Sequence, residues 1–183
     1  MAATPSTMMP LGTTAPDFTL RDTVTDHQVG LRDSAAPATI VAFICNHCPY
    51  VLHIIEGFVQ FAKDVQKQGV RVIAISSNDA TQYPQDGPER MALFAREHGF
   101  TFPYLYDGSQ DVAKAYAAAC TPDLYLFDSD LTCVYRGRFD AATPGNAEPV
   151  NGADLRAAVD AVLAGDPVSD EQIPSIGCNI KWK

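Results

Sequence analysis

The sequence predicts an α/β fold, because a buried strand runs directly into a pair of cysteines that opens a helix. Residues 39–44 are apolar or β-branched without polar alternation, which is typical of a strand buried on both faces. After Cys48, apolar residues recur every three or four positions, and Gly69 stands where such a helix would end. Residues 70–76 form a second apolar run. Strand, helix and strand in this order form a βαβ unit, so we expect the two strands to be parallel.

Further helices and strands surround this unit. Each is predicted from an apolar run, or an apolar period, that is bounded by turn-forming residues. In chain order, the pattern predicts a hairpin at 18–31, a helix from Pro88 to Gly99, a strand at 102–107, a helix after Ser109, an antiparallel hairpin at 123–136 and a final helix at 151–165.

The length and composition predict a single domain that spans residues 1–183. The chain is 46% hydrophobic and 19% charged, which is ordinary for a globular protein. Residues 1–15 are rich in Thr, Pro, Ser and Ala, so we expect a loose N-terminal arm. Residues 166–183 include several large apolar side chains, so we expect this C-terminal tail to pack back on the domain.

Charge and hydropathy exclude several classes of partner. A formal net charge of -9 argues against binding to nucleic acid or to an anionic membrane. No segment approaches the roughly 18 consecutive apolar residues of a membrane span. The N-terminus has neither the basic nor the apolar region of a secretory signal, so we expect a cytoplasmic protein. In that reducing compartment, a Cys-x-x-Cys pair is catalytic or metal-binding rather than a structural disulfide.

Cys45 and Cys48 carry the clearest functional signal. At the start of a helix, unpaired backbone N–H groups and the helix dipole favour a thiolate. We expect Cys45, nearer the exposed junction, to be the nucleophile and Cys48 to be the resolving thiol. The alternatives are two packed small residues or half of a zinc site. The sequence holds no second Cys-x-x-Cys and no His pair at zinc spacing, so we expect no metal and no cofactor beyond a redox-active Cys45–Cys48 disulfide.

The order of elements resembles the thioredoxin fold in its redoxin variety, the AhpC/TSA and TlpA-like proteins. Over roughly residues 15–165, the motifs behind this likeness are Phe43–Val51, Phe102–Asp107 and Cys120–Asp128. The ending Pro-Ser-Ile-Gly-Cys-Asn-Ile-Lys-Trp resembles that of an uncharacterised subgroup with a Cys-Asn-His-Cys-Pro motif. The resemblance implies a central mixed sheet flanked by helices, with an N-terminal hairpin and an inserted helix and strand. It also implies that Pro122, after Thr121, is a cis-proline facing the cysteine pair.

The sequence departs from both well-known redox motifs of these proteins. The Trp-Cys-Gly-Pro-Cys of ordinary thioredoxins is absent. The Pro-x-x-x-Thr-x-x-Cys of peroxiredoxins is absent too, since Cys45 stands where the Thr belongs if Cys48 is the peroxidatic position. We therefore do not assign the complete activity of either a thioredoxin or a peroxiredoxin to this sequence.

Several other residues have both a functional and a structural interpretation. His47, as a cation, would stabilise a thiolate, and Cys-x-His-Cys resembles DsbA-type dithiol oxidases; it could also be a surface histidine. Cys120 lies within reach of the pair if the likeness holds, and Cys178 in the tail could be a third redox partner. Both could instead be packed thiols. Arg138 could steady a thiolate or remain solvated, and Cys133 fits a buried core position.

These observations predict a thiol-disulfide oxidoreductase. Its substrate would be a disulfide-containing protein or a low-molecular-weight thiol or peroxide, with no nucleic-acid or membrane partner. Cys45 would attack the substrate disulfide and Cys48 would release the product. A thiol peroxidase with an antioxidant role is the first alternative. A Cu(I)-binding, Sco-like chaperone is the second, although the Sco-like Cys-x-x-x-Cys spacing is one residue longer.

Overall fold

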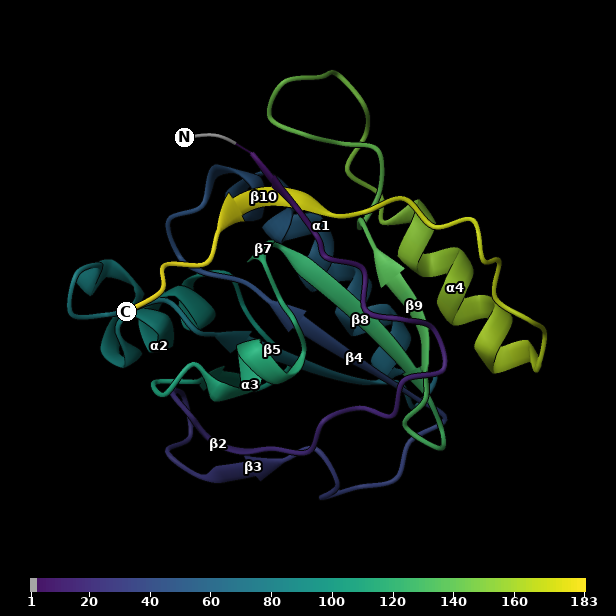
Figure 1. The fold of residues 1–183 in the computed structure, drawn as a ribbon, viewed down its shortest axis with the longest axis horizontal. Helices are drawn as coiled ribbons and strands as arrows, with labels where there is room; N and C mark the ends of the chain where they lie inside the picture. The colour runs from purple at the N-terminus through teal and green to yellow at the C-terminus, as the bar shows by residue number, and fades with distance from the viewer. Residues whose placement is uncertain (1–2) are drawn as a thin grey trace.

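The computed structural model describes residues 3–183 and confirms the predicted α/β fold around a mixed sheet (Figure 1). The strand order is β3-β2-β6-β5-β4-β8-β9. The three central strands are parallel to one another, as the βαβ pattern predicts, and both flanks of the sheet are antiparallel. The strands are β2 (Thr19–Asp22), β3 (Gln28–Gly30), β4 (Ala38–Phe43), β5 (Arg71–Ser76), β6 (Tyr104–Tyr106), β8 (Asp123–Asp128) and β9 (Cys133–Gly137).

Helices cover both faces of this sheet. The apolar sides of α1 (Pro49–Gln66), α2 (Pro88–Glu97) and α4 (Ala153–Ala164) pack into one core cluster. The short α3 (Asp111–Ala115) packs into a second cluster, together with side chains from the N-terminal segment. In residues 3–183, no helix is long and apolar enough to cross a lipid bilayer.

Strand β4 lies between the two clusters. Ile40 and Ala42 join the cluster under α1, whereas Val41 and Phe43 join the cluster on the opposite face. All six residues of β4 are buried. Burial on both faces explains the absence of polar alternation in the sequence. The strand that leads into the cysteine pair is thus enclosed on both faces.

The N-terminal segment differs from the loose arm predicted for residues 1–15. Residues 1–2 lie outside the described part of the chain. From there on, β1 (Thr4–Pro5) pairs with β10 (Ile176–Asn179), and Met9 is buried. The backbone N–H of Gly12 also donates to the carbonyl of Cys133 at 2.9 Å. Composition alone misled the prediction, because the pairing partner is at the other end of the chain.

The C-terminal tail packs on the domain through β10. This strand also pairs with β7 (Cys120–Thr121), so that β1, β10 and β7 form a small second sheet (Figure 1). Beyond it, the carbonyl of Lys181 accepts the backbone N–H of Asp79 at 2.8 Å, and its N–H donates to Asn78 at 2.9 Å. The tail is therefore an integral layer of the fold.

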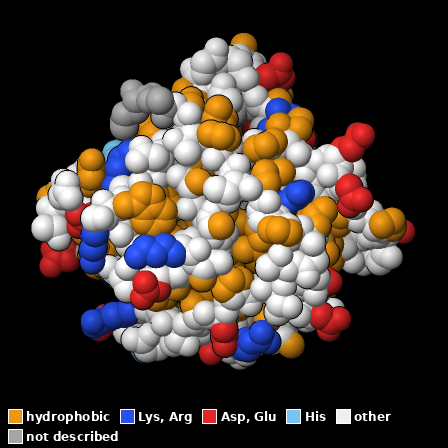
Figure 2. Space-filling view, viewed as in Figure 1, with side chains coloured by type: hydrophobic (Ala, Val, Ile, Leu, Met, Phe, Trp, Pro, Cys, Tyr) orange, Lys and Arg blue, Asp and Glu red, His pale blue; other side chains and the backbone are white. Residues whose placement is uncertain are grey.

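The surface mixes charged and apolar side chains. On the face shown in Figure 2, acidic and basic groups are interspersed with apolar patches. The exposed large apolar side chains include Ile173 and Ile176 of the tail and Leu52 of α1.

Candidate active site

Both cysteines lie at the junction between β4 and α1, as predicted. The backbone N–H of Ile44 still donates to the carbonyl of Ile75 at 2.9 Å, so the chain leaves the sheet just before Cys45. Cys48 is the N-cap of α1, and Pro49 begins the helix, where its missing N–H costs nothing. Both thiols are free and almost fully enclosed, at 1% and 0% exposure.

Thr121 faces both sulfurs. Its hydroxyl lies 3.4 Å from the Sγ of Cys45, and its carbonyl oxygen accepts a hydrogen bond from the Cys48 thiol at 3.0 Å. The Thr121–Pro122 peptide bond is cis, in agreement with the resemblance. The structure therefore brings together four of the predicted site residues from two separate segments.

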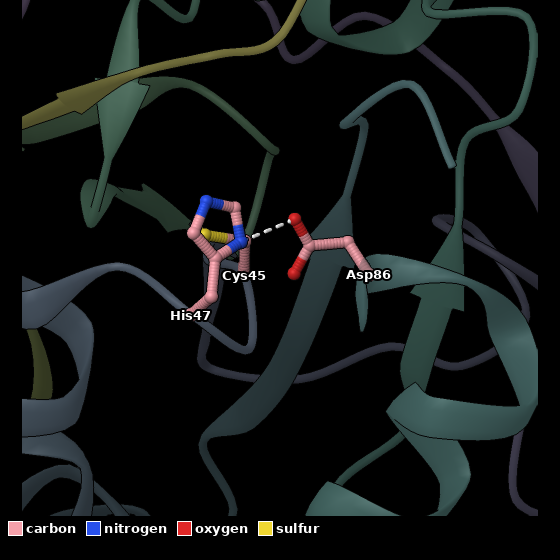
Figure 3. Close-up of side chains that lie close together, drawn as sticks. All are labelled: Cys45, His47 and Asp86. Carbon is pink, nitrogen blue, oxygen red and sulfur yellow. Dashed lines mark ion pairs between the residues drawn. The ribbon is translucent and has the colours of Figure 1, made fainter. Parts of the chain in front are cut away.

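His47 is held by a carboxylate that the sequence analysis did not single out. Its Nδ1 lies 2.7 Å from Oδ2 of Asp86, whose side chain is fully buried (Figure 3). The imidazole also stacks on Tyr83, with parallel ring planes. Asp86 accepts hydrogen bonds from the backbone N–H of Asn46 at 2.9 Å and from the amide of Asn78 at 2.8 Å. These donors compensate for the burial of its charge.

Asp86 was missed because it looks like a turn former in a Pro- and Gly-containing loop. Asn78 follows β5 at the same edge of the sheet where Cys45 follows β4, because the two strands are parallel, and its amide donates to Asp86. A short 3-10 turn, η1 (Pro84–Asp86), folds the loop back over that edge. The available signal was therefore the location of the loop after β5.

The negative charge of the reduced pair rests on Cys48. The pKa of Cys48 is lowered to about 4, above all by the neighbouring Cys45 thiol, with smaller contributions from Cys178 and from the backbone N–H of Val51. The pKa of Cys45 is raised well above its ordinary value by its hydrogen bond to Cys48, by burial and by the carboxylate of Asp86. This resting charge differs from the expectation that Cys45 carries the thiolate.

The contacts with Thr121 suit the opposite placement of the proton. A neutral Cys48 can donate to the Thr121 carbonyl, and the Thr121 hydroxyl can donate to a charged Cys45. The helix-start donors suit a charged Cys48 instead. The two sulfurs thus share one proton, and moving it from Cys45 to Cys48 turns Cys45 into the thiolate.

Two further predicted cysteines lie close to the pair. Cys178 stands opposite Thr121 in the β10–β7 register and lies in the same core cluster as Cys48. Its pKa is raised to about 11 by burial and by Cys48. Cys120 is fully buried, and its thiol donates weakly to the carbonyl of Pro122 at 3.5 Å; burial raises its pKa strongly. Cys133 is a core thiol in the cluster on the other face, as predicted.

Arg138 contacts a carboxylate instead of the cysteine pair. Its Nε lies 2.5 Å from Oδ2 of Asp154 on α4. It lines a groove of about 280 Å³ that Pro122 and Tyr50 also border. A hollow of about 740 Å³ elsewhere, between α2 and the N-terminal hairpin, is lined by neither cysteine. A thiolate-stabilising role for Arg138 therefore has no contact to support it.

Cys45, His47 and Asp86 also form a set of donors that could hold a metal ion. One ligand atom from each lies within 4.8 Å of the other two (Figure 3). A thiolate, an imidazole and a carboxylate are a donor set that suits zinc. The same geometry also serves to orient the imidazole beside Cys45.

A dithiol at a strand–helix junction, facing a cis-proline, is the arrangement of a thioredoxin-like protein. The AhpC/TSA family model matches residues 11–136, and the chain belongs to this family. A thiol-disulfide oxidoreductase, ResA, from Geobacillus kaustophilus is 28% identical over 127 residues, which cover 69% of this chain and 68% of ResA.

Solved structures extend this likeness. An uncharacterized conserved protein from Geobacillus kaustophilus is 54% identical, with a TM-score of 0.98, over 100% of this chain and 97% of that one. The thioredoxin domain of a thiol-disulfide oxidoreductase from Bacteroides vulgatus is 15% identical, with a TM-score of 0.63, over 81% of this chain and 98% of that one. The second likeness shows that the chain has the thioredoxin fold.

Because Cys45 and Cys48 share one proton, we expect one of the two thiols to be unusually acidic. Thiolate absorbance in the ultraviolet should persist as the pH falls through neutrality and disappear only near pH 4. Cys45→Ala should raise the pKa of Cys48 by roughly 1–3 units, because it removes the main donor. Cys133→Ser is the control and should leave the titration unchanged. A wild-type thiolate that is already lost at pH 7–8 would contradict the shared proton.

Proposed function

We propose that this protein is a thiol-disulfide oxidoreductase whose Cys45–Cys48 pair exchanges with substrate disulfides. The observation that carries the proposal is the pair of free thiols at the start of α1, both in contact with Thr121. Exchange needs one activated thiolate and a second thiol within reach. A thiol-disulfide oxidoreductase among the relatives supports the same chemistry.

In the proposed reaction, the pair gives two electrons to the substrate. The shared proton moves to Cys48, and the Cys45 thiolate attacks one sulfur of the substrate disulfide. One substrate thiolate leaves, takes up a proton from solvent, and a mixed disulfide with Cys45 remains. The Cys48 thiolate then attacks the Sγ of Cys45, the second substrate thiolate leaves, and the Cys45–Cys48 disulfide forms. The proton of Cys48 is released in this second step.

The enclosure of the pair favours small substrates. The outer edge of β7, beside Pro122, is already paired with β10, so an extended partner chain cannot add a strand there. Both sulfurs are almost fully covered. We therefore propose low-molecular-weight disulfides, or disulfides on a protruding loop, as substrates. Five free cysteines fit a reducing compartment, and we propose the cytoplasm.

A thiol peroxidase is the second candidate, and the low pKa of Cys48 favours it. A thiolate is the form that peroxide oxidises, and peroxide is small enough to reach an enclosed sulfur. The resulting sulfenic acid would condense with Cys45 to give the same disulfide and water. The Thr121 hydroxyl contacts Cys45 rather than donating to a lone peroxidatic thiolate. We therefore expect peroxide reduction to be the slower reaction.

Replacing Cys45 or Cys48 by Ser should distinguish the attacking thiol from the resolving thiol. Cys45→Ser should reduce exchange activity to background, because the attacking sulfur is lost. Cys48→Ser should accumulate the mixed disulfide at Cys45, which mass spectrometry of the protein after reaction with a small disulfide would detect. Cys133→Ser, a buried thiol in the other cluster, is the matched control. Full activity in Cys45→Ser would show that Cys48 is the attacking sulfur.

Charges beside the pair should set its reduction potential. Asp86 disfavours a thiolate on Cys45, so Asp86→Asn should stabilise the anionic reduced pair and raise the potential. His47→Ala leaves that carboxylate without its ion pair and should lower the potential. A change of about 1.4 kcal/mol corresponds to about 30 mV for this couple. Redox titration against glutathione measures both. Shifts in the same direction would refute the assignment, and urea unfolding would check that each variant is folded.

A further inference from the structure

Strand β10 places a third thiol against the cysteine pair. In the β10–β7 register, Cys178 is the partner of Thr121, the residue that contacts both Cys45 and Cys48. Cys178 belongs to the same core cluster as Cys45 and Cys48, and it lies close enough to Cys48 for each thiol to shift the pKa of the other. Strand β10 also contacts α1, which begins immediately after Cys48, as Figure 1 shows. Three cysteines from two distant segments of the chain thus lie around Thr121.

This placement is fixed by close packing. A Cβ on Gly177 would lie 1.9 Å from the carbonyl oxygen of Thr121, so only glycine allows β10 to approach so closely. On either side, the N–H of Ile180 donates to the carbonyl of Ala119 at 3.1 Å, and the Ser175 hydroxyl donates to Gly137 at 2.7 Å. These contacts fix the position of Cys178 opposite Thr121.

We propose that Cys178 is a third redox thiol, which exchanges with the Cys45–Cys48 disulfide to form a Cys48–Cys178 disulfide. This inference rests on the proposed function, because the first disulfide is its product. The Cys178 thiolate attacks the Sγ of Cys48, the Cys45–Cys48 bond breaks, and the electron pair leaves on Cys45. The proton lost by Cys178 is taken up by Cys45. No net oxidation occurs, and Cys45 becomes free for a second reaction.

The electrostatics of the oxidised state favour this step. In the reduced protein, burial and the neighbouring Cys48 thiolate together hold the pKa of Cys178 at about 11. Once Cys48 is in a disulfide, its negative charge is gone, whereas the favourable contribution of Lys181 remains. Cys178 therefore becomes more acidic at the stage when an attacking thiolate is needed. The thiol of Cys120 donates instead to the carbonyl of Pro122.

The test uses the full chain with Cys45→Ser, oxidised by one equivalent of diamide and mapped by peptide mass spectrometry at acidic pH. Most of Cys48 should be in an intramolecular disulfide with Cys178. The same variant carrying Cys120→Ser as well should behave identically, whereas Cys45→Ser with Cys178→Ser should give only intermolecular or small-molecule adducts of Cys48. Intermolecular Cys48 dimers as the main product of Cys45→Ser alone would overturn the proposal.

The wild-type protein supplies an independent measurement. After oxidation and trapping with N-ethylmaleimide, a fraction of chains should carry labelled Cys45 together with a Cys48–Cys178 disulfide, and Cys178→Ser should abolish that fraction. Labelled Cys178 in every oxidised chain would contradict the third thiol while leaving the Cys45–Cys48 exchange intact. A wild-type protein that shows no exchange with disulfides would instead refute the proposed function.

Discussion

The peptide at Thr121 is the point on which the site depends. Its hydroxyl contacts Cys45, its carbonyl accepts from Cys48, and its backbone pairs with Cys178 on β10. The same carbonyl excludes any side chain at Gly177. A displacement of this peptide would change the contacts of three sulfurs and of the C-terminal tail together. The tail and the cysteine pair are thus one structural unit, although they are far apart in the sequence.

Around this peptide, burial and neighbouring groups determine which thiol carries the negative charge. Two enclosed thiols that share a proton keep one negative charge near the helix start, where backbone N–H groups face it. Asp86 opposes a negative charge on Cys45, and the Nδ1 of His47 lies 2.7 Å from the carboxylate of Asp86. The balance of these groups, rather than exposure, decides which sulfur is the thiolate. This balance accounts for a thiol that is acidic and yet hidden from solvent.

Local patterns were sufficient to predict much of the fold. The apolar run of β4, the helical period after Cys48 and the second run of β5 specified the βαβ unit, because each is set by its own residues. The apolar residues of the tail likewise indicated that it packs back. The prediction of a loose N-terminal arm was wrong because this segment is ordered by pairing with β10, which a local pattern cannot reveal.

The residues of the site differ in the same way in how far they could be predicted. Cys45, Cys48 and His47 follow from one motif, and Pro122 follows from the resemblance to redoxins. Asp86 could not be singled out, because its role depends on how the loop after β5 folds over the sheet edge. The negative charge on Cys48 in the reduced protein could not be predicted from the sequence either, since it depends on groups from α1, β7 and β10.

The most direct test compares the rates at which two oxidants react with the reduced wild-type protein. Equal concentrations of hydrogen peroxide and of a small disulfide, such as oxidised glutathione, are offered separately, and thiol loss is followed by stopped flow. The account predicts that thiols are lost much faster with the disulfide and that both reactions yield the Cys45–Cys48 disulfide without a stable sulfenic acid. Faster oxidation by peroxide would contradict the account and would assign the protein to the thiol peroxidases.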